Sequence, residues 1–158
     1  MARHVIFLDF DGVLNTEQHQ ARLAVEGKPT KDAWGPLFDP RAVGYLRGIL
    51  EATDAEVVIS SSWRYAHSLG SLRTMWSARR LPGEVADTIA CGAFYISRGE
   101  EIECWLNRHG CPDYVIIDDV DDFYPSQRRR FIETNPITGL KEADALKAIE
   151  ILTINNNQ

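Results

Sequence analysis

Apolar runs and amphipathic stretches alternate along the chain. Three short continuous apolar runs, each closed by polar residues, are typical of buried strands in a parallel sheet: residues 5–8, 56–59 and 114–117. Apolar residues at helical spacing predict helices between and after these runs, over residues 39–53, 68–81, 97–110 and 141–152. Weaker signals indicate a helical turn over 17–25 and two further short strands, over 88–91 and 130–134.

This alternation predicts the fold class. Strands that alternate with helices favour an α/β three-layer sandwich with a mostly parallel, Rossmann-like sheet and right-handed crossovers. We expect one domain over residues 1–154, with a flap or small cap inserted around 15–38, where glycine and proline interrupt any sustained period. Residues 155–158 are expected to be a frayed tail. In the last helix we expect four residues to face the core: Ala145, Leu146, Ile149 and Leu152.

Polar side chains stand at the end of each strong strand. Asp9 and Asp11 follow the first strand, three serines at positions 60–62 follow the second, and Asp118 and Asp119 close the third. Because the carboxyl ends of parallel strands meet at one edge of the sheet, we expect these groups to form one site. Gathered carboxylates repel one another unless a hard divalent cation lies between them, which favours Mg²⁺. The serine hydroxyls and nearby backbone amides suit an anion, such as a phosphoryl group, beside that metal.

Each of these signals also has a local explanation. Aspartate at a strand end is common turn chemistry, and serine hydroxyls often satisfy neighbouring backbone groups. Four acids within residues 118–122 also fit a solvated loop. Their coincidence at three successive strand ends favours a single site over three separate accidents.

The overall composition is that of an ordinary folded protein. The 158 residues are 44% apolar and 25% charged, which argues against intrinsic disorder. The formal charge of −6 comes from 17 basic and 23 acidic residues, which argues against a general electrostatic affinity for nucleic acid or anionic lipid but allows a local basic patch to bind a phosphate group. Six acids lie at positions 9, 11, 118, 119, 121 and 122, and the remaining 17 balance the 17 bases. The acidic surplus is therefore concentrated where a cation would bind.

Cysteine usage and the N-terminus indicate a location. Cys91, Cys104 and Cys111 form no CxxC pair and leave at least one thiol unpaired, which suits a reducing compartment. We expect them to be small core residues. The apolar stretch near the N-terminus is too short for a signal peptide or a membrane span. We therefore expect a cytoplasmic protein with no membrane partner.

The motifs at the strand ends resemble those of a known enzyme superfamily. The segment Phe7-Leu8-Asp9-Phe10-Asp11-Gly12-Val13-Leu14-Asn15 is similar to the first motif of haloacid dehalogenase-like (HAD-like) hydrolases, in which hydrophobic residues precede DxDGV or DxDxT. The serines resemble the second motif, and Ile116-Ile117-Asp118-Asp119 resembles the fourth. The combination of DGVLN, SSWR, RGEEI and NPITGL resembles, more narrowly, the HAD domain of Swiss Army Knife RNA repair proteins. A HAD-like sheet with a minimal cap is the implied fold.

The resemblance implies a role for each residue at the strand ends. Asp9 would be the nucleophile that attacks a phosphoryl group and forms an aspartyl phosphate. Asp11 would protonate the leaving oxygen and later deprotonate the hydrolytic water. Asp118 and Asp119 would complete a Mg²⁺ site with Asp9 and the backbone carbonyl of Asp11. One of the serines would bind phosphoryl oxygens, and the spacing before Trp63 favours Ser61 or Ser62 over Ser60 without deciding between them.

Two arginines are further candidates for the site. The third HAD-like motif needs a basic residue, and no lysine lies between Ser61 and Asp118. Arg98, at the start of the helix that Ser97 caps, occupies the position that the resemblance indicates, although an exposed helix-surface charge is an equally good interpretation. Arg64 is a candidate for contacting a substrate phosphate, and a surface ion pair is nearly as good an explanation.

Taken together, the motifs predict a Mg²⁺-dependent phosphomonoester hydrolase that acts through an aspartyl phosphate. The expected partner is a phosphorylated substrate, either a small molecule or a nucleic-acid end, the second by analogy with the narrower resemblance. The alternative is a non-catalytic partner-binding or regulatory module in a nucleic-acid repair or defence system. Retention of both Asp9 and Asp11 argues against that alternative. The sequence carries no signal for oligomeric state, and the four tryptophans are expected in the core or at its rim rather than as base-stacking platforms.

Overall fold

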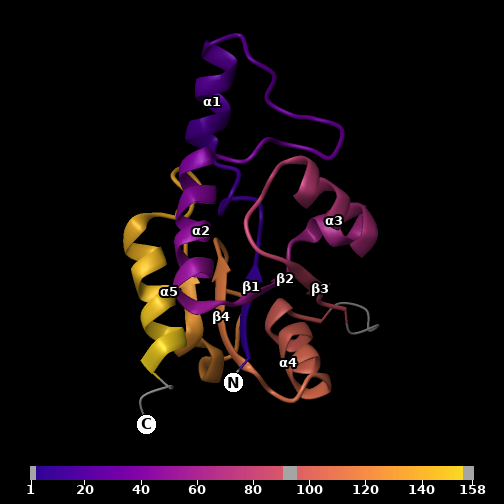
Figure 1. The fold of residues 1–158 in the computed structure, drawn as a ribbon, viewed down its shortest axis with the longest axis vertical. Coiled ribbons are helices and arrows are strands. Elements are labelled where there is room, and N and C mark those ends of the chain that lie inside the picture. Colours follow the sequence, from indigo (N-terminus) through magenta and orange to yellow (C-terminus); the bar gives the residue numbers. More distant parts are fainter. Residues whose placement is uncertain (1–2, 91–95, 155–158) are drawn as a thin grey trace.

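Five parallel strands form the centre of the computed structural model, which describes residues 3–90 and 96–154 (Figure 1). The sheet has the order β3-β2-β1-β4-β5. Its strands are β1 (His4–Leu8), β2 (Glu56–Ile59), β3 (Val85–Thr88), β4 (Asp113–Asp118) and β5 (Phe131–Glu133). β1 is central and pairs with both β2 and β4, so the three strands with polar ends are neighbours. The predicted α/β, Rossmann-like fold class is confirmed.

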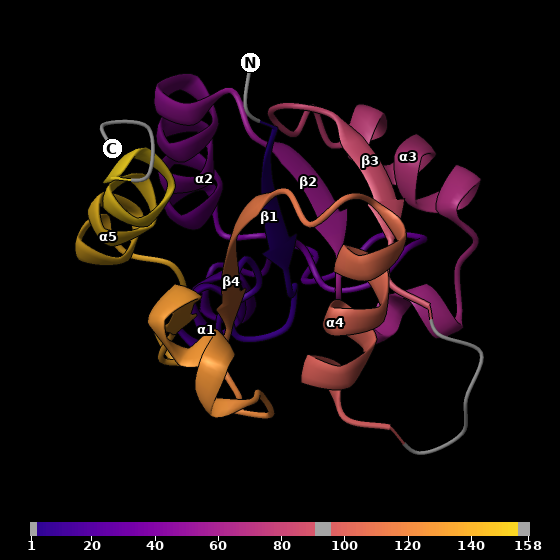
Figure 2. The same ribbon diagram turned by 90° about the horizontal axis from the view of Figure 1, so that it is seen from below.

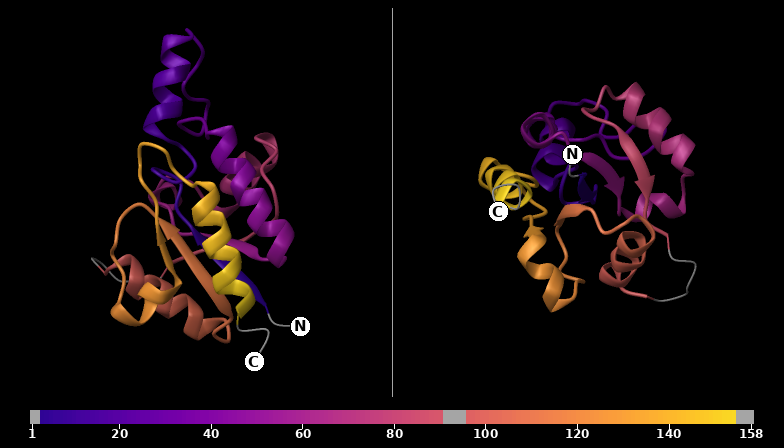
Figure 3. Two further views of the ribbon diagram at one scale, coloured as in Figure 1. Left: turned by 90° about the vertical axis from the view of Figure 1, so that its left-hand side faces the viewer. Right: turned by 60° about the horizontal axis from the view of Figure 1, so that its bottom comes forward.

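Helices cover both faces of this sheet (Figure 2). One face is packed by α2 (Pro40–Thr53), α3 (Leu69–Ala78) and α5 (Glu142–Ile154). The opposite face is packed by α4 (Arg98–Arg108) and by the chain around the 3₁₀ helix η2 (Pro125–Arg130). On the first face, α2 and α5 lie side by side (Figure 3). The result is the three-layer arrangement expected from alternating strands and helices.

The strands are continuously apolar because both of their faces are buried. In β1, Ile6 and Leu8 belong to the core beneath α2, α3 and α5. Val5 and Phe7, which point the other way, belong to the core beneath α4. All four side chains are fully buried. A strand with one solvated face would have shown alternation instead.

Local capping explains why the helices begin where the sequence indicated. Asp39 caps α2 by accepting a hydrogen bond from the Arg41 N–H at 2.9 Å, and Pro40 occupies the first turn. Ser97 caps α4 by accepting from the Glu100 N–H at 3.1 Å. These caps are short-range contacts, so the sequence alone indicates them.

Several predictions about individual elements are wrong. The strand expected over 88–91 is β3, at Val85–Thr88; this edge strand has only one buried residue, so no apolar run marks it. Leu146 of α5 is 61% exposed, because that helix packs through Ala145, Ala148 and Leu152. Cys111 is exposed rather than part of the core. Cys91 and the expected frayed tail, 155–158, lie outside the described residues.

The segment 15–38 projects from the end of the molecule toward which the strands point (Figure 1). It contains α1 (Glu17–Val25) and a loop that returns to α2. Its two ends are joined, because the Asp39 N–H donates to the Leu14 carbonyl at 2.7 Å and the Thr16 hydroxyl donates to the Asp39 carboxylate at 3.1 Å.

Among the described residues, no helix has the length and apolarity needed to cross a membrane.

Candidate active site

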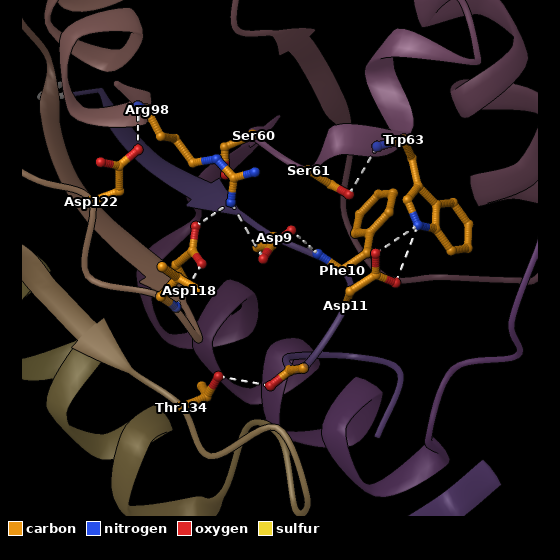
Figure 4. Close-up of polar contacts among 12 residues, drawn as sticks. Asp9, Phe10, Asp11, Ser60, Ser61, Trp63, Arg98, Asp118, Asp122 and Thr134 are labelled. Carbon is orange, nitrogen blue, oxygen red and sulfur yellow. Dashed lines mark hydrogen bonds and ion pairs between the residues drawn. The ribbon is translucent and has the colours of Figure 1, made fainter. Parts of the chain in front are cut away.

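The polar ends of β1, β2 and β4 meet at one edge of the sheet (Figure 4). A cavity of about 320 Å³ opens there. Its lining includes most of the predicted site residues together with the loop after β4: Asp9, Asp11, Ser62, Arg98, Asp119, Val120, Asp121 and Asp122. The fold therefore brings together groups that are more than 100 residues apart in the sequence.

Three carboxylates lie close enough to share one cation. Asp9, Asp118 and Asp119 each offer an oxygen, and these oxygens lie within 4.8 Å of one another. Asp9 and Asp118 are buried, and Asp119 is half-buried. Burial, reinforced by the Asp118 carboxylate, raises the pKa of Asp9 to about 8. Burial and Asp118 also raise the pKa of Asp119.

The chemistry of these three carboxylates fits Mg²⁺. Each offers an oxygen atom, which is the kind of ligand that a hard divalent cation prefers. Burial and the repulsion from Asp118 raise the pKa of Asp9 to about 8 and also raise the pKa of Asp119, so the cluster favours a nearby positive charge. A divalent cation supplies that charge, so Asp9, Asp118 and Asp119 fit a magnesium site.

The backbone fixes two of these carboxylates in place. The Phe10 N–H donates to Oδ1 of Asp9 at 2.8 Å, while the Asp9 N–H continues the β1–β4 ladder by donating to the Ile117 carbonyl at 3.1 Å. The Val120 N–H donates to Oδ1 of Asp118 at 3.0 Å. Phe10 turns into the core, as expected for alternating side chains at a strand end.

Gly12 makes room for Asp119. Its φ is +77°, a conformation that favours glycine. A Cβ on this residue would lie 2.3 Å from Oδ2 of Asp119. The Gly12 carbonyl is also held, because it accepts a hydrogen bond from the Thr134 hydroxyl at 2.8 Å. Glycine at this turn is therefore a requirement of the carboxylate cluster.

Asp11 faces the open side of the site. Its side chain is exposed, in contrast to Asp9. Oδ1 accepts hydrogen bonds from Nδ2 of Asn15 at 2.6 Å and from Nε1 of Trp63 at 3.2 Å. The same Trp63 N–H lies 3.3 Å from Oδ2. The carboxylate is thus exposed to solvent and held in one orientation.

Arg98 lies within the site rather than on an exposed helix surface. Nη1 of Arg98 is 2.5 Å from Oδ2 of Asp118 and 3.4 Å from Oδ2 of Asp9. Burial opposes its charge, but the carboxylates of Asp118 and Asp9 outweigh that effect and raise the pKa of Arg98. The backbone N–H of Arg98 donates to Asp122 at 2.9 Å, which ties the start of α4 to the loop after β4.

The three serines have different surroundings. The Ser60 hydroxyl is buried and has no hydrogen-bond partner among the described residues. The Ser61 hydroxyl accepts a hydrogen bond from the backbone N–H of Trp63 at 3.2 Å and caps the 3₁₀ helix η1 (Ser62–Tyr65). Ser62 is exposed and lines the cavity.

Arg64 is directed away from the cavity. Nη1 donates to the carbonyls of Ser60 and Ser61, at 2.6 and 2.9 Å. Nη2 pairs with Glu101 at 2.7 Å, and the Arg64 side chain is only 5% exposed. Its guanidinium therefore joins the end of β2 to the first turn of α4, and it is absent from the cavity lining.

Two contacts of the site were not anticipated from the sequence. Asn15 is four residues from Asp11 in the first motif, so its spacing is a signal that could have been used. Trp63 had no such signal, because its indole reaches Asp11 across 52 residues of sequence. The sequence predicted only a core or rim position for Trp63, and not the hydrogen bond from its indole to Asp11.

Comparison with known proteins agrees with this geometry. A family model described as the HAD domain in Swiss Army Knife RNA repair proteins matches residues 5–145. A comparison with curated proteins finds no match. The family match runs from β1 into α5, so it includes every strand of the sheet and every residue of the site described above. The chain belongs to the family of HAD domains in Swiss Army Knife RNA repair proteins.

Proposed function

We propose that this protein is a Mg²⁺-dependent phosphomonoester hydrolase that works through an aspartyl phosphate on Asp9. The observation that carries the proposal is the position of Asp9 in the cavity, beside Asp118, Asp119 and Arg98 and two residues from the exposed Asp11. A buried carboxylate with cationic partners suits nucleophilic attack, and an exposed carboxylate next to it suits proton transfer. Membership of a HAD family supports a hydrolase of this type.

The carboxylates of Asp9, Asp118 and Asp119 would hold Mg²⁺, with the backbone carbonyl of Asp11 as a further ligand. When bound, the cation would neutralise charge on the carboxylates and on the phosphoryl oxygens. Arg98 supplies a second positive charge at two of these carboxylates, Asp9 and Asp118. We assign Ser62 to the phosphoryl oxygens because it is the serine that lines the cavity.

The proposed reaction has two steps, formation of the aspartyl phosphate and its hydrolysis. A carboxylate oxygen of Asp9 attacks phosphorus, and the bond from phosphorus to the alcohol oxygen breaks as Asp11 gives that oxygen a proton. Asp11 then takes a proton from water, whose oxygen attacks the phosphorus of the aspartyl phosphate. The Asp9–phosphorus bond breaks, which returns the carboxylate and releases inorganic phosphate.

For the substrate, we propose a phosphorylated nucleotide or nucleic-acid end. The support is the family description, which refers to RNA repair proteins. The candidate site opens to solvent through Asp11 and Ser62, both exposed, which is compatible with a bulky substrate. A screen that includes nucleotides, sugar phosphates, and 3′- and 5′-phosphorylated oligonucleotides tests this assignment.

The activity itself is tested with Asp9→Asn. The wild type should release phosphate from an aryl phosphate with Mg²⁺, stop with EDTA and recover when Mg²⁺ is restored. Asp9→Asn should lower turnover by at least about a thousandfold, because the nucleophile is lost. Hydroxylamine added during wild-type turnover should convert the acyl phosphate to a hydroxamate at Asp9, located by peptide mass spectrometry.

Asp54→Asn is the matched control. Asp54 is exposed at the end of α2, before β2 begins, and its left-handed backbone also suits asparagine. This variant should keep wild-type turnover. Unchanged turnover in Asp9→Asn would refute the nucleophile, and no phosphate release from any substrate class would favour a non-catalytic, partner-binding module.

A further inference from the structure

The orientation of Asp11 depends on a residue outside the DxD motif. Oδ1 of Asp11 accepts from Asn15 at 2.6 Å and from Nε1 of Trp63 at 3.2 Å. A carboxylate oxygen has two in-plane lone pairs, so these two donors engage both of them. Among the residues that the structure describes, Oδ2 has only the longer Trp63 contact, at 3.3 Å, and is therefore the oxygen left to exchange a proton with a substrate.

Trp63 is itself held by a layer of aromatic side chains. Its ring packs edge-on against Phe10, with centroids 5.2 Å apart. It also packs against the tilted ring of Phe38, with centroids 5.6 Å apart. Gly35 approaches the same ring so closely that a Cβ on it would lie 3.0 Å from the indole. Phe10 belongs to the turn after β1, whereas Gly35 and Phe38 belong to the segment 15–38. The insertion thus forms one wall around the indole.

Arg79 fixes that wall. It makes two contacts with Asp32, Nε to Oδ2 at 2.9 Å and Nη2 to Oδ1 at 2.6 Å. It also donates to the carbonyls of Gly35 and Pro36, at 3.0 and 3.1 Å. The same guanidinium lies 4.5 Å from the Phe38 ring centroid and 5.6 Å from that of Trp63. One cation therefore binds the loop 32–38, including its Phe38 ring, and lies beside the Trp63 ring.

We propose that Trp63 is a positioning residue for Asp11, and that the loop 32–38, fixed by Arg79, holds the indole in place. This inference rests on the proposed function, because it assigns Asp11 the proton transfer to the leaving oxygen. It also gives the insertion a role inside the site: the loop aligns the Asp11 carboxylate through the indole N–H. An N–H shared between two oxygens restrains rotation of the carboxylate, which is how a contact of this kind contributes to orientation.

Trp76 provides the matched comparison. Trp76 is buried in the core beneath α2, α3 and α5, whereas Trp63 is half-buried and packs against that core, and the Trp76 ring lies 6.3 Å from Phe10. Its Nε1 likewise makes a hydrogen bond, but to the Pro82 carbonyl at 3.1 Å. Substituting phenylalanine at either position removes an indole N–H and part of the aromatic packing. Only the change at Trp63 removes a contact to Asp11.

The test uses esters that differ in their need for a proton donor. Single-turnover alcohol release is measured with Mg²⁺ on an aryl phosphate, whose leaving group departs readily, and on an alkyl phosphate, whose leaving group requires protonation. Trp63→Phe should slow the alkyl ester at least about tenfold more than the aryl ester, because general acid catalysis is worth 10²–10⁴-fold in enzymes. Trp76→Phe should slow both esters by the same factor.

Two further variants separate positioning from general loss of structure. Added to Asp11→Asn, the Trp63→Phe change should cause no additional loss on the alkyl ester, because the group that it orients is already gone. Arg79→Lys keeps the charge but loses the fork to Asp32, and should reproduce the selective loss at a smaller size, about threefold. Arg79→Lys also serves as the test if Trp63→Phe does not fold.

The outcomes distinguish this inference from the proposed function. A wild type that releases no alcohol from either ester would overturn the proposed function, and the positioning role with it. An active wild type for which Trp63→Phe, or Arg79→Lys in its place, slows both esters equally would overturn the positioning role alone. A selective loss on the alkyl ester that disappears in the Asp11→Asn background would support it.

Discussion

At the scale of single residues, the site depends on where side chains are missing as much as on where they are present. Gly12 has a left-handed backbone, and any Cβ on it would displace Asp119. Asp119 belongs to the carboxylate cluster, so this displacement would remove one ligand from the cation site. Gly12 therefore affects the cation site through Asp119, which lies more than 100 positions later in the chain.

Gly12→Ala should weaken Mg²⁺ binding by at least about tenfold, as expected if about 1.4 kcal/mol of ligand interaction is lost. Titration calorimetry measures the affinity. The left-handed backbone adds a cost of roughly 1–2 kcal/mol to folding, seen in chemical denaturation.

Gly110→Ala is the control for backbone strain. Gly110 has the same φ of +77°, but a Cβ there meets no atom within 4 Å. It should lower stability by a similar amount and leave Mg²⁺ affinity unchanged. Equal affinities in the two variants would show that Asp119 is not displaced or does not bind the cation.

At the scale of elements, a buried ion pair joins the end of β2 to α4. The side chains of Arg64 and Glu101 are 5% and 10% exposed. Arg64 also donates hydrogen bonds to the carbonyls of Ser60 and Ser61, which lie beyond the end of β2. The pair thus holds the serine loop against the helix whose first residue is Arg98. The structure gives Arg64 a supporting position, in contrast to the substrate contact considered from the sequence.

Arg64→Ala should lower the free energy of unfolding by about 3–5 kcal/mol, because it leaves Glu101 buried without its partner. Chemical denaturation measures this change. Arg73 is a matched control, since it also donates to two carbonyls, those of Val85 and Ala86, but it is exposed. Arg73→Ala should cost less than about 1 kcal/mol. A stable Arg64→Ala variant with a raised KM would instead favour contact with the substrate.

At the scale of the whole molecule, the charge surplus of the sequence has a definite place. The net charge is −6, and the six acids in the motifs at the ends of β1 and β4 account for the surplus. Three of them form the carboxylate cluster, in which burial and the neighbouring Asp118 raise the pKa of Asp9 and of Asp119. The metal-free protein therefore holds a proton at Asp9 that the unfolded chain has lost, over the range from the ordinary pKa of 3.8 to about 8.

This difference predicts how stability depends on pH. Because the folded state binds more protons in that range, the metal-free protein should lose stability as the pH rises from about 5 to about 8. The slope for one proton approaches about 1.4 kcal/mol per pH unit. Thermal unfolding in EDTA at several pH values measures it. Saturating Mg²⁺ should reduce the slope, since the bound cation keeps the carboxylates ionised.

Asp9→Asn removes the titrating group, so its stability in EDTA should change less with pH than that of the wild type. Asp54→Asn changes an exposed aspartate remote from the cluster and should retain the wild-type slope. Parallel slopes in Asp9→Asn and the wild type would show that Asp9 does not carry the proton.

Most of the elements, and the chemistry at the strand ends, could be predicted from the sequence. Strands β1, β2 and β4 are buried on both faces, so continuous apolar runs mark them, and the caps Asp39 and Ser97 act within a few residues. Asp9, Asp118 and Asp119 could be placed together because parallel strands end at one edge of the sheet. Strand β3 was misplaced because an edge strand needs no apolar run.

Which polar side chains face the cavity depends on tertiary packing and could not be predicted from the sequence. Arg64 and Arg98 are both cations near a motif, yet one is buried against Glu101 and the other reaches Asp118 and Asp9. The Trp63 indole meets Asp11 only when β2 pairs with β1 and the loop 32–38 packs against the indole ring. These contacts join positions 20 to 89 residues apart, and their direction depends on packing that no local pattern records.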